Sequence, residues 1–293
     1  MVIRDATLSA AAYARLTPQT RQVDLIGGIL SQMRRVDRLF KILISDAFTT
    51  MGRMDVLRIV WTRAQKKKNI RSIRLPVGEI FMDGQNVAID FQVLGQVLLD
   101  EVYSEVNLRD KIVVDLGAHK GYFAAYALMA GAKAVFSYEP EPTNFACLSR
   151  FADTARLRGK IIEVVQAAAG AADEELTLYT SFESWRHTTI AGQSEHSGGK
   201  LRVPCNSLSS ILAIVRKRFP EEALILKVDT EGAECAILLQ APEECFRSIH
   251  AVVFEYHSFA KCGLESILAR IGVLGFEYAA CVKEADLHIL RRL

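Results

Sequence analysis

Residues 112–125 read IVVDLGAHKGYFAA, a short apolar run followed by a glycine-containing turn and a helical segment. Ile112 to Asp115 are predicted to form a short apolar strand, and the residues from Tyr122 onward a helix. Gly117 lets the backbone turn sharply between them and approach a ligand, and the free amide groups of a helix N-terminus attract polar or anionic groups. In open α/β sheets, a nucleotide-like ligand is expected at such a turn.

Beyond Lys111 the chain alternates short apolar runs with helical stretches, which is typical of a parallel sheet covered on both faces. The predicted strands are Ile112 to Asp115, Ala134 to Tyr138, Ile161 to Gln166, Leu224 to Val228 and Ala251 to Glu255. A terminal pair, Phe276 to Val282 and Leu287 to Arg291, has too short a link for a crossover helix and must be antiparallel. We therefore expect a doubly wound, Rossmann-like α/β sheet of seven strands, five parallel plus a C-terminal antiparallel hairpin.

The N-terminal quarter differs in charge from the rest. Residues 1–74 hold 15 Lys/Arg against 5 Asp/Glu, and apolar residues recur at helical spacing from Val23 to Phe48. We expect residues 1–69 to form a basic helical cap or oligomerisation region, which could join two copies as a homodimer. A lead-in hairpin, Ser72 to Leu75 with Glu79 to Met82, and a helix from Phe91 to Tyr103 are expected in residues 70–110. The catalytic domain is assigned to residues 111–293.

The six cysteines are scattered, with no C-x-x-C pair. This pattern argues against both a zinc knuckle and a disulfide framework, so a set of reduced thiols is the simpler expectation. No apolar run approaches the ~20 residues of a membrane span. We therefore expect a soluble, cytoplasmic protein.

A second acidic residue narrows the choice of ligand. Glu139 follows the second strand, where a carboxylate can accept hydrogen bonds from both hydroxyls of a ribose. NAD would suit these features, but its G-x-G-x-x-G loop needs a second glycine where this chain has His119. S-adenosylmethionine has no phosphate, so a wider loop that starts at Asp115 suits its amino acid end better. The simpler alternative is a glycine turn in an α/β domain that binds no ligand.

Three stretches together resemble the FkbM family of class I methyltransferases: VVDLGAHKG at 113–121, YEPEPTNF at 138–145 and LKVDTEGAE at 226–234. The resemblance covers roughly residues 90–290. It implies a seven-stranded Rossmann-like fold, S-adenosylmethionine as methyl donor, and usually a hydroxyl acceptor on a sugar, polyketide or other metabolite. Two departures leave loop contacts open: His119 stands where the family commonly has Asn, and Leu208-Ser209-Ser210 where it commonly has Leu-Asp-Asp.

The predicted cofactor-binding residues lie in the loops that follow the first three strands. They are Asp115, Gly117, Ala118, His119, Gly121, Glu139, Pro140, Asn144, Gln166 and Ala167.

Methyl transfer from a sulfonium is an in-line displacement, so catalysis rests mainly on alignment, but a hydroxyl acceptor must also lose its proton. Asp229 is the first candidate for the base because it closes the fourth strand, and His257, after the fifth strand, is the second. Glu231 is a third candidate, although it and Glu234 could equally complement a helix dipole. These acids also suggest a cation, but without a D-x-D or H-x-H arrangement we expect no metal.

A long insertion, from about Asp173 to Pro204, separates the third and fourth parallel strands. Loops of this length at a catalytic edge are often functional, so we expect Trp185, Arg186 and His187 to recognise the acceptor. The alternative for its first half is a hairpin that packs Leu176, Leu178 and Tyr179 against the sheet edge.

The leading hypothesis is therefore an O-methyltransferase that acts on a small or medium metabolite. One alternative is an RNA or protein methyltransferase that grips its polymer with the basic N-terminus. Basic residues without a recognisable nucleic-acid module do not by themselves predict a nucleic-acid partner. A further alternative, an NAD-type oxidoreductase, is disfavoured by His119.

Overall fold

The computed structural model describes residues 71–85, 87–98, 102–184, 186–191, 198–260 and 262–292. The expected helical cap, and with it the homodimer and polymer-gripping hypotheses, concerns residues 1–69, which lie outside this range. Across the described segments, no helix is both long and apolar enough to cross a membrane.

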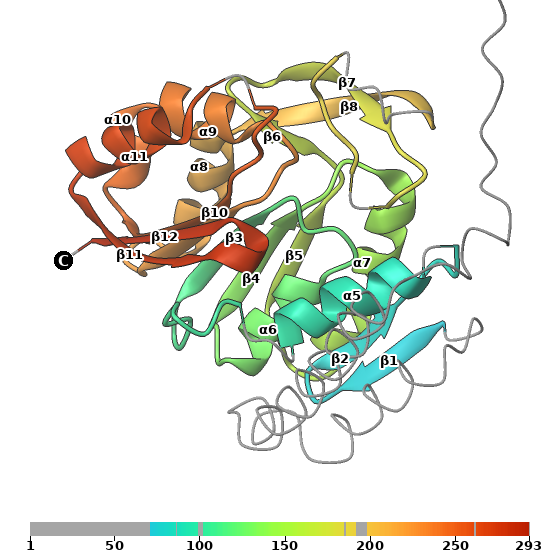
Figure 1. Ribbon diagram of the computed structural model, residues 1–293. Coiled ribbons are helices and arrows are strands. Elements are labelled where there is room, and N and C mark those ends of the chain that lie inside the picture. Colours follow the sequence, from blue (N-terminus) through green and yellow to red (C-terminus); the bar gives the residue numbers. More distant parts are fainter. Residues whose placement is uncertain are drawn as a thin grey trace, which may run out of the picture.

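A seven-stranded sheet runs through the molecule in the order β11-β12-β10-β9-β3-β4-β5 (Figure 1). Its parallel strands are β3 (Ile112–Leu116), β4 (Ala134–Tyr138), β5 (Ile162–Val165), β9 (Leu224–Val228) and β10 (Ile249–Glu255). The last two strands, β11 (Phe276–Val282) and β12 (Leu287–Arg292), are antiparallel. The predicted arrangement of five parallel strands and a terminal hairpin is confirmed.

The sheet separates two hydrophobic cores, which is why its central strands are apolar at every position or nearly so. Val113 belongs to the core shared with α5 (Val87–Leu98), α6 (Tyr122–Met129) and α7 (Pro142–Arg156). Val114 belongs to the core on the other face, shared with α8 (Leu208–Arg218), α9 (Glu234–Gln240), α10 (Glu243–Phe246) and α11 (Leu264–Val273). Successive residues of β3 thus pack on opposite helical layers.

The lead-in segment forms the expected antiparallel hairpin, β1 (Ser72–Leu75) and β2 (Gly78–Phe81). The helix that follows begins and ends earlier than predicted, since α5 covers Val87–Leu98. Asp90 lies in its first turn, where an acid complements the helix dipole. Tyr103 is in a turn after the helix, and its ring packs against that of Phe123 with centroids 4.5 Å apart.

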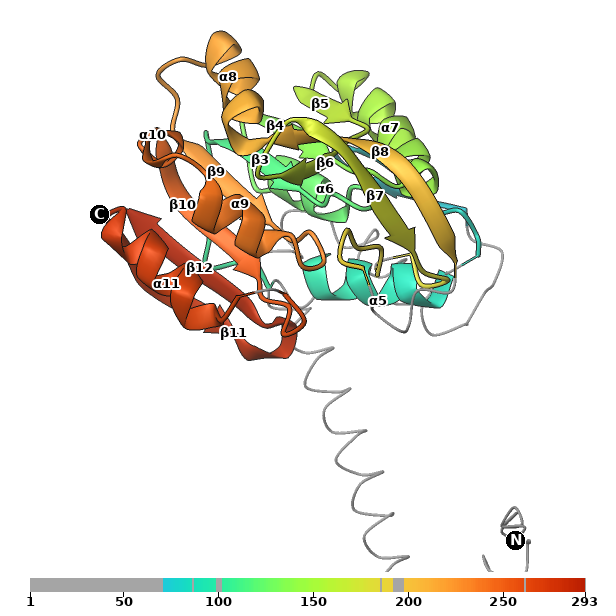
Figure 2. The same cartoon turned by 90° about the horizontal axis from the view of Figure 1, so that it is seen from above.

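The long insertion contributes to a second sheet of three strands, in the order β6-β8-β7 (Figure 2). Its strands are β6 (Ala168–Gly170), β7 (Glu174–Thr180) and β8 (Gly199–Ser207). The hairpin predicted from Leu176, Leu178 and Tyr179 exists, but it pairs with β6 and not with the edge of the central sheet. Leu178 lies in a small core of its own with Ala168, Val203 and Cys205.

The expectation of six reduced thiols is wrong for one pair, because Cys235 and Cys262 form a disulfide. They are 27 residues apart in sequence, with Cys235 in the first turn of α9 and Cys262 in the loop after β10. Since β9 and β10 are parallel neighbours, the segments that follow their carboxyl ends meet at the same edge of the sheet. The other four cysteines are free.

Candidate active site

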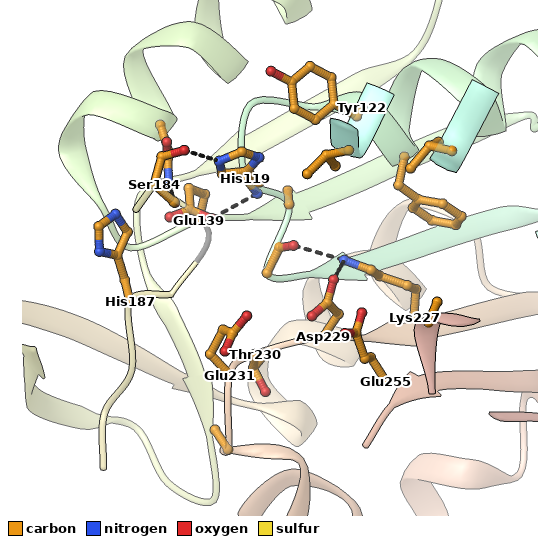
Figure 3. Close-up of a pocket in the computed structure, with 18 of the residues that line it drawn as sticks. His119, Tyr122, Glu139, Ser184, His187, Lys227, Asp229, Thr230, Glu231 and Glu255 are labelled. Carbon is orange, nitrogen blue, oxygen red and sulfur yellow. Dashed lines mark hydrogen bonds and ion pairs between the residues drawn. The ribbon is translucent and has the colours of Figure 1, made fainter. Parts of the chain in front are cut away.

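A cavity of about 470 Å³ opens at the carboxyl ends of β3, β4, β9 and β10 (Figure 3). Its volume falls in the range of about 300–1,000 Å³ that is usual for small-molecule sites. The walls come from α5, the loop after β3, the start of the small sheet and the end of β9, together with Ser184, His187 and Thr189. This is the edge at which open α/β sheets bind their ligands.

Gly117 fits a position that has no room for a side chain. Its φ is +78°, and a Cβ atom there would lie 1.7 Å from the backbone oxygen of Asp229. The amides of Gly117 and Ala118 both donate to the carbonyl of Tyr138 at 3.0 Å. The loop after β3 is therefore held between the ends of β4 and β9.

Glu139 lies where the sequence predicts a ribose ligand. Its Oε2 accepts a hydrogen bond of 2.8 Å from the amide of His119, and its Oε1 one of 2.9 Å from the amide of Glu141. Burial raises the pKa of Glu139 to about 7, and these backbone hydrogen bonds offset the effect only in part. The carboxylate is thus fixed in place on the cavity wall.

His119 joins the cofactor loop to the insertion. Its Nε2 lies 3.1 Å from the hydroxyl of Ser184, whose backbone oxygen accepts a 2.7 Å hydrogen bond from the side chain of Asn144. Burial, and then the charge of Lys120, hold the pKa of His119 well below its ordinary value, so the ring is neutral. His119 and Asn144 both line the cavity.

Asp115 does not line the cavity, although it was predicted to contact the cofactor. It is fully buried, with Oδ1 3.2 Å from Lys227 Nζ and Oδ2 accepting a hydrogen bond from Ser137. Lys227 also lies 3.2 Å from Asp229 Oδ2 and donates to the carbonyl of Gly117 at 2.8 Å. Burial alone would lower the pKa of Lys227. The neighbouring carboxylates of Asp229 and Asp115 outweigh that effect and raise the pKa above its ordinary value, so the amine is charged.

Three carboxylates, those of Asp229, Glu231 and Glu255, form an acidic wall at the ends of β9 and β10. Burial raises the pKa of Glu231, and burial with the nearby charge of Asp229 raises that of Glu255 to about 8. His257 lies outside the cavity lining, with Nε2 3.5 Å from Glu231 and Nδ1 3.0 Å from Glu234. Burial lowers the pKa of His257, but hydrogen bonds to the two glutamates outweigh this and raise it to about 12. His257 therefore carries a proton.

Of the other predicted cofactor residues, Ala118 and Pro140 line the cavity, whereas Gly121, Gln166 and Ala167 do not. Gly121 instead precedes α6 with φ +88°, and Gln166 is exposed. The chain bends after β5, so Ala168 and Ala169 of the small sheet reach the cavity in their place.

Of the residues predicted to recognise the acceptor, one lines the cavity and one does not. His187 lines the cavity, and its Nδ1 accepts a 3.0 Å hydrogen bond from the amide of Ser181. Arg186 is exposed, forms an ion pair of 3.0 Å with Glu183 and does not reach the cavity. Trp185 lies outside the described residues.

The sequence reasoning missed several residues of the wall. Lys227 could have been found from the sequence, because a lysine inside the apolar run Leu224 to Val228 is expected to be buried and to need a charged partner. Glu255 closes β10 much as Asp229 follows β9. Gln92 and Gln96, four residues apart on α5, present amides on one helix face to the cavity.

Ser209 and Ser210, which stand where the family commonly has two aspartates, lie at the start of α8 and do not line the cavity. Ser207 caps this helix by accepting from the amide of Ser210. Asp173 supplies a carboxylate there, which accepts 2.7 Å and 2.5 Å hydrogen bonds from the amide of Ser207 and the hydroxyl of Ser210. A carboxylate from elsewhere in the chain thus lies where the family commonly has its own acids.

Some solved structures share a distant likeness. Magnesium protoporphyrin IX methyltransferase from Synechocystis PCC 6803 with bound SAM is 11% identical, with 85% of this chain and 98% of that one covered and a TM-score of 0.37. A precorrin-6y C5,15-methyltransferase from Geobacter metallireducens is 12% identical, with 68% and 89% covered and a TM-score of 0.40. At these scores the likenesses carry no argument. No curated protein sequence matches the chain significantly.

The model of the methyltransferase FkbM domain matches residues 115–278, more than half of the chain. The match includes the Gly117 loop, Glu139, the acidic wall and His257. On this match the chain belongs to the FkbM family of S-adenosylmethionine-dependent methyltransferases.

Proposed function

We propose that the enzyme O-methylates a hydroxyl group of a small or medium metabolite, such as a sugar or a polyketide. One observation carries the proposal. The cavity contains one carboxylate that can bind a ribose, and a separate group of carboxylates that can accept the proton of a hydroxyl group. In Figure 3, Glu139 lies beside His119 and Ser184, apart from the group of Asp229, Glu231 and Glu255. The NAD-type alternative is wrong, because the chain is a methyltransferase.

The residues present fit S-adenosylmethionine. Glu139 offers acceptors for ribose hydroxyls, and the acidic wall offers carboxyl oxygens to a sulfonium. Two buried atoms on the same side, His119 Nδ1 and Asn144 Oδ1, have no hydrogen-bond partner among the described residues. Buried polar atoms are normally satisfied, so these two suit polar groups of a ligand. When bound, the cofactor supplies a methyl group on a sulfonium.

The chain's own residues then have two tasks. Glu139 binds the ribose, while Lys227 fixes Gly117 and Asp229 relative to each other. A carboxylate of the acidic wall accepts the proton of the acceptor hydroxyl, and Asp229 is the first choice because the Gly117 loop packs directly on its backbone. His257 does not suit the role of base, since it already holds a proton.

Isothermal titration with S-adenosylhomocysteine tests the cofactor half. We expect Glu139→Ala to weaken binding about tenfold or more, since hydrogen bonds to a charged group contribute about 1.5–3 kcal/mol. Glu265→Ala, an exposed change on α11, should leave binding unchanged. Wild-type protein that does not bind, or Glu139→Ala that binds equally well, would contradict the proposal.

A panel of hydroxylated metabolites with methyl-labelled cofactor tests the acceptor half. Mass spectrometry should find the label in an ether. Asp229→Asn should lower kcat by about 10²–10⁴-fold, the usual contribution of a positioned base, with little change in the Kd for S-adenosylhomocysteine. Asp153→Asn, an exposed change on α7, is the matched control. Label on nitrogen or carbon, or an unchanged rate in Asp229→Asn, would overturn this half.

A further inference from the structure

Three side chains of two strand ends converge on one point. Asp229, Glu231 and His257 each present one ligand atom, and these atoms all lie within 4.8 Å of one another. Two ligands about 2.1 Å from a metal ion and about 110° apart are separated by about 3.4 Å. The observed distance from His257 Nε2 to Glu231 Oε2 is 3.5 Å. This pair is therefore spaced like two ligands of one ion, and Asp229 supplies an oxygen as a third ligand atom within 4.8 Å of both.

Glu234 holds the remote nitrogen of His257 from outside this group. Its Oε1 lies 3.0 Å from His257 Nδ1 and also accepts from the amides of Thr230 and Gly232, at 3.0 Å and 3.1 Å. A carboxylate on the remote nitrogen of a histidine is the usual accompaniment of a metal ligand, because it fixes the tautomer and the ring orientation. With Nδ1 occupied in this way, Nε2 is the atom turned toward Glu231.

Carboxyl groups outnumber basic side chains in this region. Five carboxylates, those of Asp115, Asp229, Glu231, Glu234 and Glu255, meet one lysine and one histidine. Lys227 already forms ion pairs with both Asp115 and Asp229. Glu234 is fully buried, and its Oε2 has no hydrogen-bond partner among the described residues. Buried carboxylates in excess are costly unless they are paired or bind a metal.

We propose that Asp229, Glu231 and His257 bind a divalent cation at the wall of the cavity. A mixed set of carboxylates and one imidazole suits Mn²⁺ or Zn²⁺ better than an all-oxygen cation such as Ca²⁺. The sequence analysis expected no metal, because Asp229, Glu231 and His257 follow the ends of two different strands and form no D-x-D or H-x-H arrangement. The ion takes the place of the proton that His257 shares with Glu231.

The role of the ion rests on the proposed function, whereas its binding does not. Asp229 and Glu231 both belong to the cavity wall, so an ion on them lies where an acceptor hydroxyl would bind. A bound cation lowers the pKa of an oxygen that it contacts, which eases the loss of the hydroxyl proton. When the ion is bound, Asp229 acts as a ligand, and the role of base that the proposed function gives to Asp229 passes to Glu255, the third carboxylate of the acidic wall.

Titration of the full chain with Mn²⁺, followed by electron paramagnetic resonance, tests the site directly, and calorimetry with Zn²⁺ repeats the test. We expect saturable binding of one ion per chain. Glu231→Gln and His257→Gln should abolish binding, and Glu234→Gln should weaken it about 10–100-fold, as changes behind a ligand do. Two exposed controls, Glu265→Gln on α11 and His250→Ala on β10, should bind like the wild type.

Absence of saturable binding of both ions would overturn the proposal, as would binding that persists in Glu231→Gln and His257→Gln. The group would then be a set of ion pairs around a protonated His257. S-adenosylhomocysteine titrated into the same samples separates the two proposals. If it binds and the metals do not, only the cation site fails, and if the metals bind alone, only the proposed function fails. Its binding also shows that each variant is folded.

Discussion

At the scale of single residues, Gly117 combines an unusual backbone conformation with a close contact. Gly117→Ala would bring its Cβ to 1.7 Å from Asp229 O at φ +78°, so the loop must move. Gly159→Ala is the matched control, because Gly159 has φ +75° and nothing within 4 Å of an added Cβ. Gly159→Ala should lower the free energy of unfolding by about 1–2 kcal/mol, the cost of the left-handed conformation alone. Gly117→Ala should lower it by more and reduce binding of S-adenosylhomocysteine. Urea unfolding of both variants checks this expectation, and equal losses would refute it.

The raised pKa of Glu139 predicts a pH dependence of cofactor binding. Below about pH 7 Glu139 is largely protonated and offers fewer acceptors to a ribose. The Kd for S-adenosylhomocysteine should therefore fall as the pH rises from 6 to 8, by at most about tenfold per pH unit. Glu139→Gln should bind more weakly and lose this component of the pH dependence. Titrations at several pH values measure both, and an identical slope in the variant would assign the effect to another group.

The same group affects folding with a definite sign. Because its pKa is higher in the folded than in the unfolded chain, Glu139 stabilises the fold below its ordinary pKa, and this contribution is lost as the pH rises through about 7. Relative to Glu139→Gln, the ligand-free wild type should therefore lose stability between pH 6 and pH 8. Urea unfolding of the two proteins at both pH values measures the difference.

His119 shows what a single position can reveal in advance. Its φ of +52° is in the left-handed region, which Asn and His enter more easily than most residues. The family's common Asn at this position is consistent with that backbone. The sequence did not indicate that the ring would turn toward Ser184, because that contact is 65 residues away along the chain.

At the scale of elements, Lys120 ties the lead-in segment to the cofactor loop. Its amine is fully buried, 2.6 Å from Asp90 of α5 and 3.2 Å from Asp83, which follows β2. Lys120→Ala should lower the free energy of unfolding by about 3–5 kcal/mol, because it leaves buried carboxylates without their cation. Lys217→Ala, exposed on α8, should have little effect. Denaturation curves measure both. Lys120→Met combined with Asp90→Asn should recover part of the loss, and failure to recover any would show that the charges are not the cause.

The disulfide joins two other elements, α9 and the loop after β10. A link that closes a loop of this length stabilises a protein by about 2–4 kcal/mol. Cys235→Ser with Cys262→Ser should lower the free energy of unfolding by that amount, and reducing agent should do the same to the wild type only. A double variant that still responds to reducing agent would contradict the assignment.

For the whole molecule, the five parallel strands and the terminal hairpin could be predicted, because the parallel strands are buried on both faces and appear as short apolar runs. The limits of α5 could not be predicted. The first turn of this helix contains Asp90, which pairs with Lys120, and that pairing depends on packing between distant segments. In the site, Gly117 and Glu139 were found because they follow strand ends directly. Two features of the site region could not be predicted: the ion pair of Asp115 with Lys227 and the disulfide of Cys235 with Cys262. Both join neighbouring strands or the segments that follow them, so no local sequence pattern indicates them.

The small sheet β6-β8-β7 has a core of its own, separate from the two cores on the central sheet. The chain after β7 places Ser184, His187 and Thr189 on the cavity wall, while the Gly117 loop and Glu139 lie at the ends of strands of the central sheet. Substitutions in β7 and β8, which do not include Ser184 or the β6 residues Ala168 and Ala169, should therefore accumulate with little effect on the Gly117 loop and Glu139. Under the proposed function the side of the small sheet receives the acceptor, and over evolutionary time it should change faster than the donor side, so that related chains acquire new substrates while they keep one cofactor.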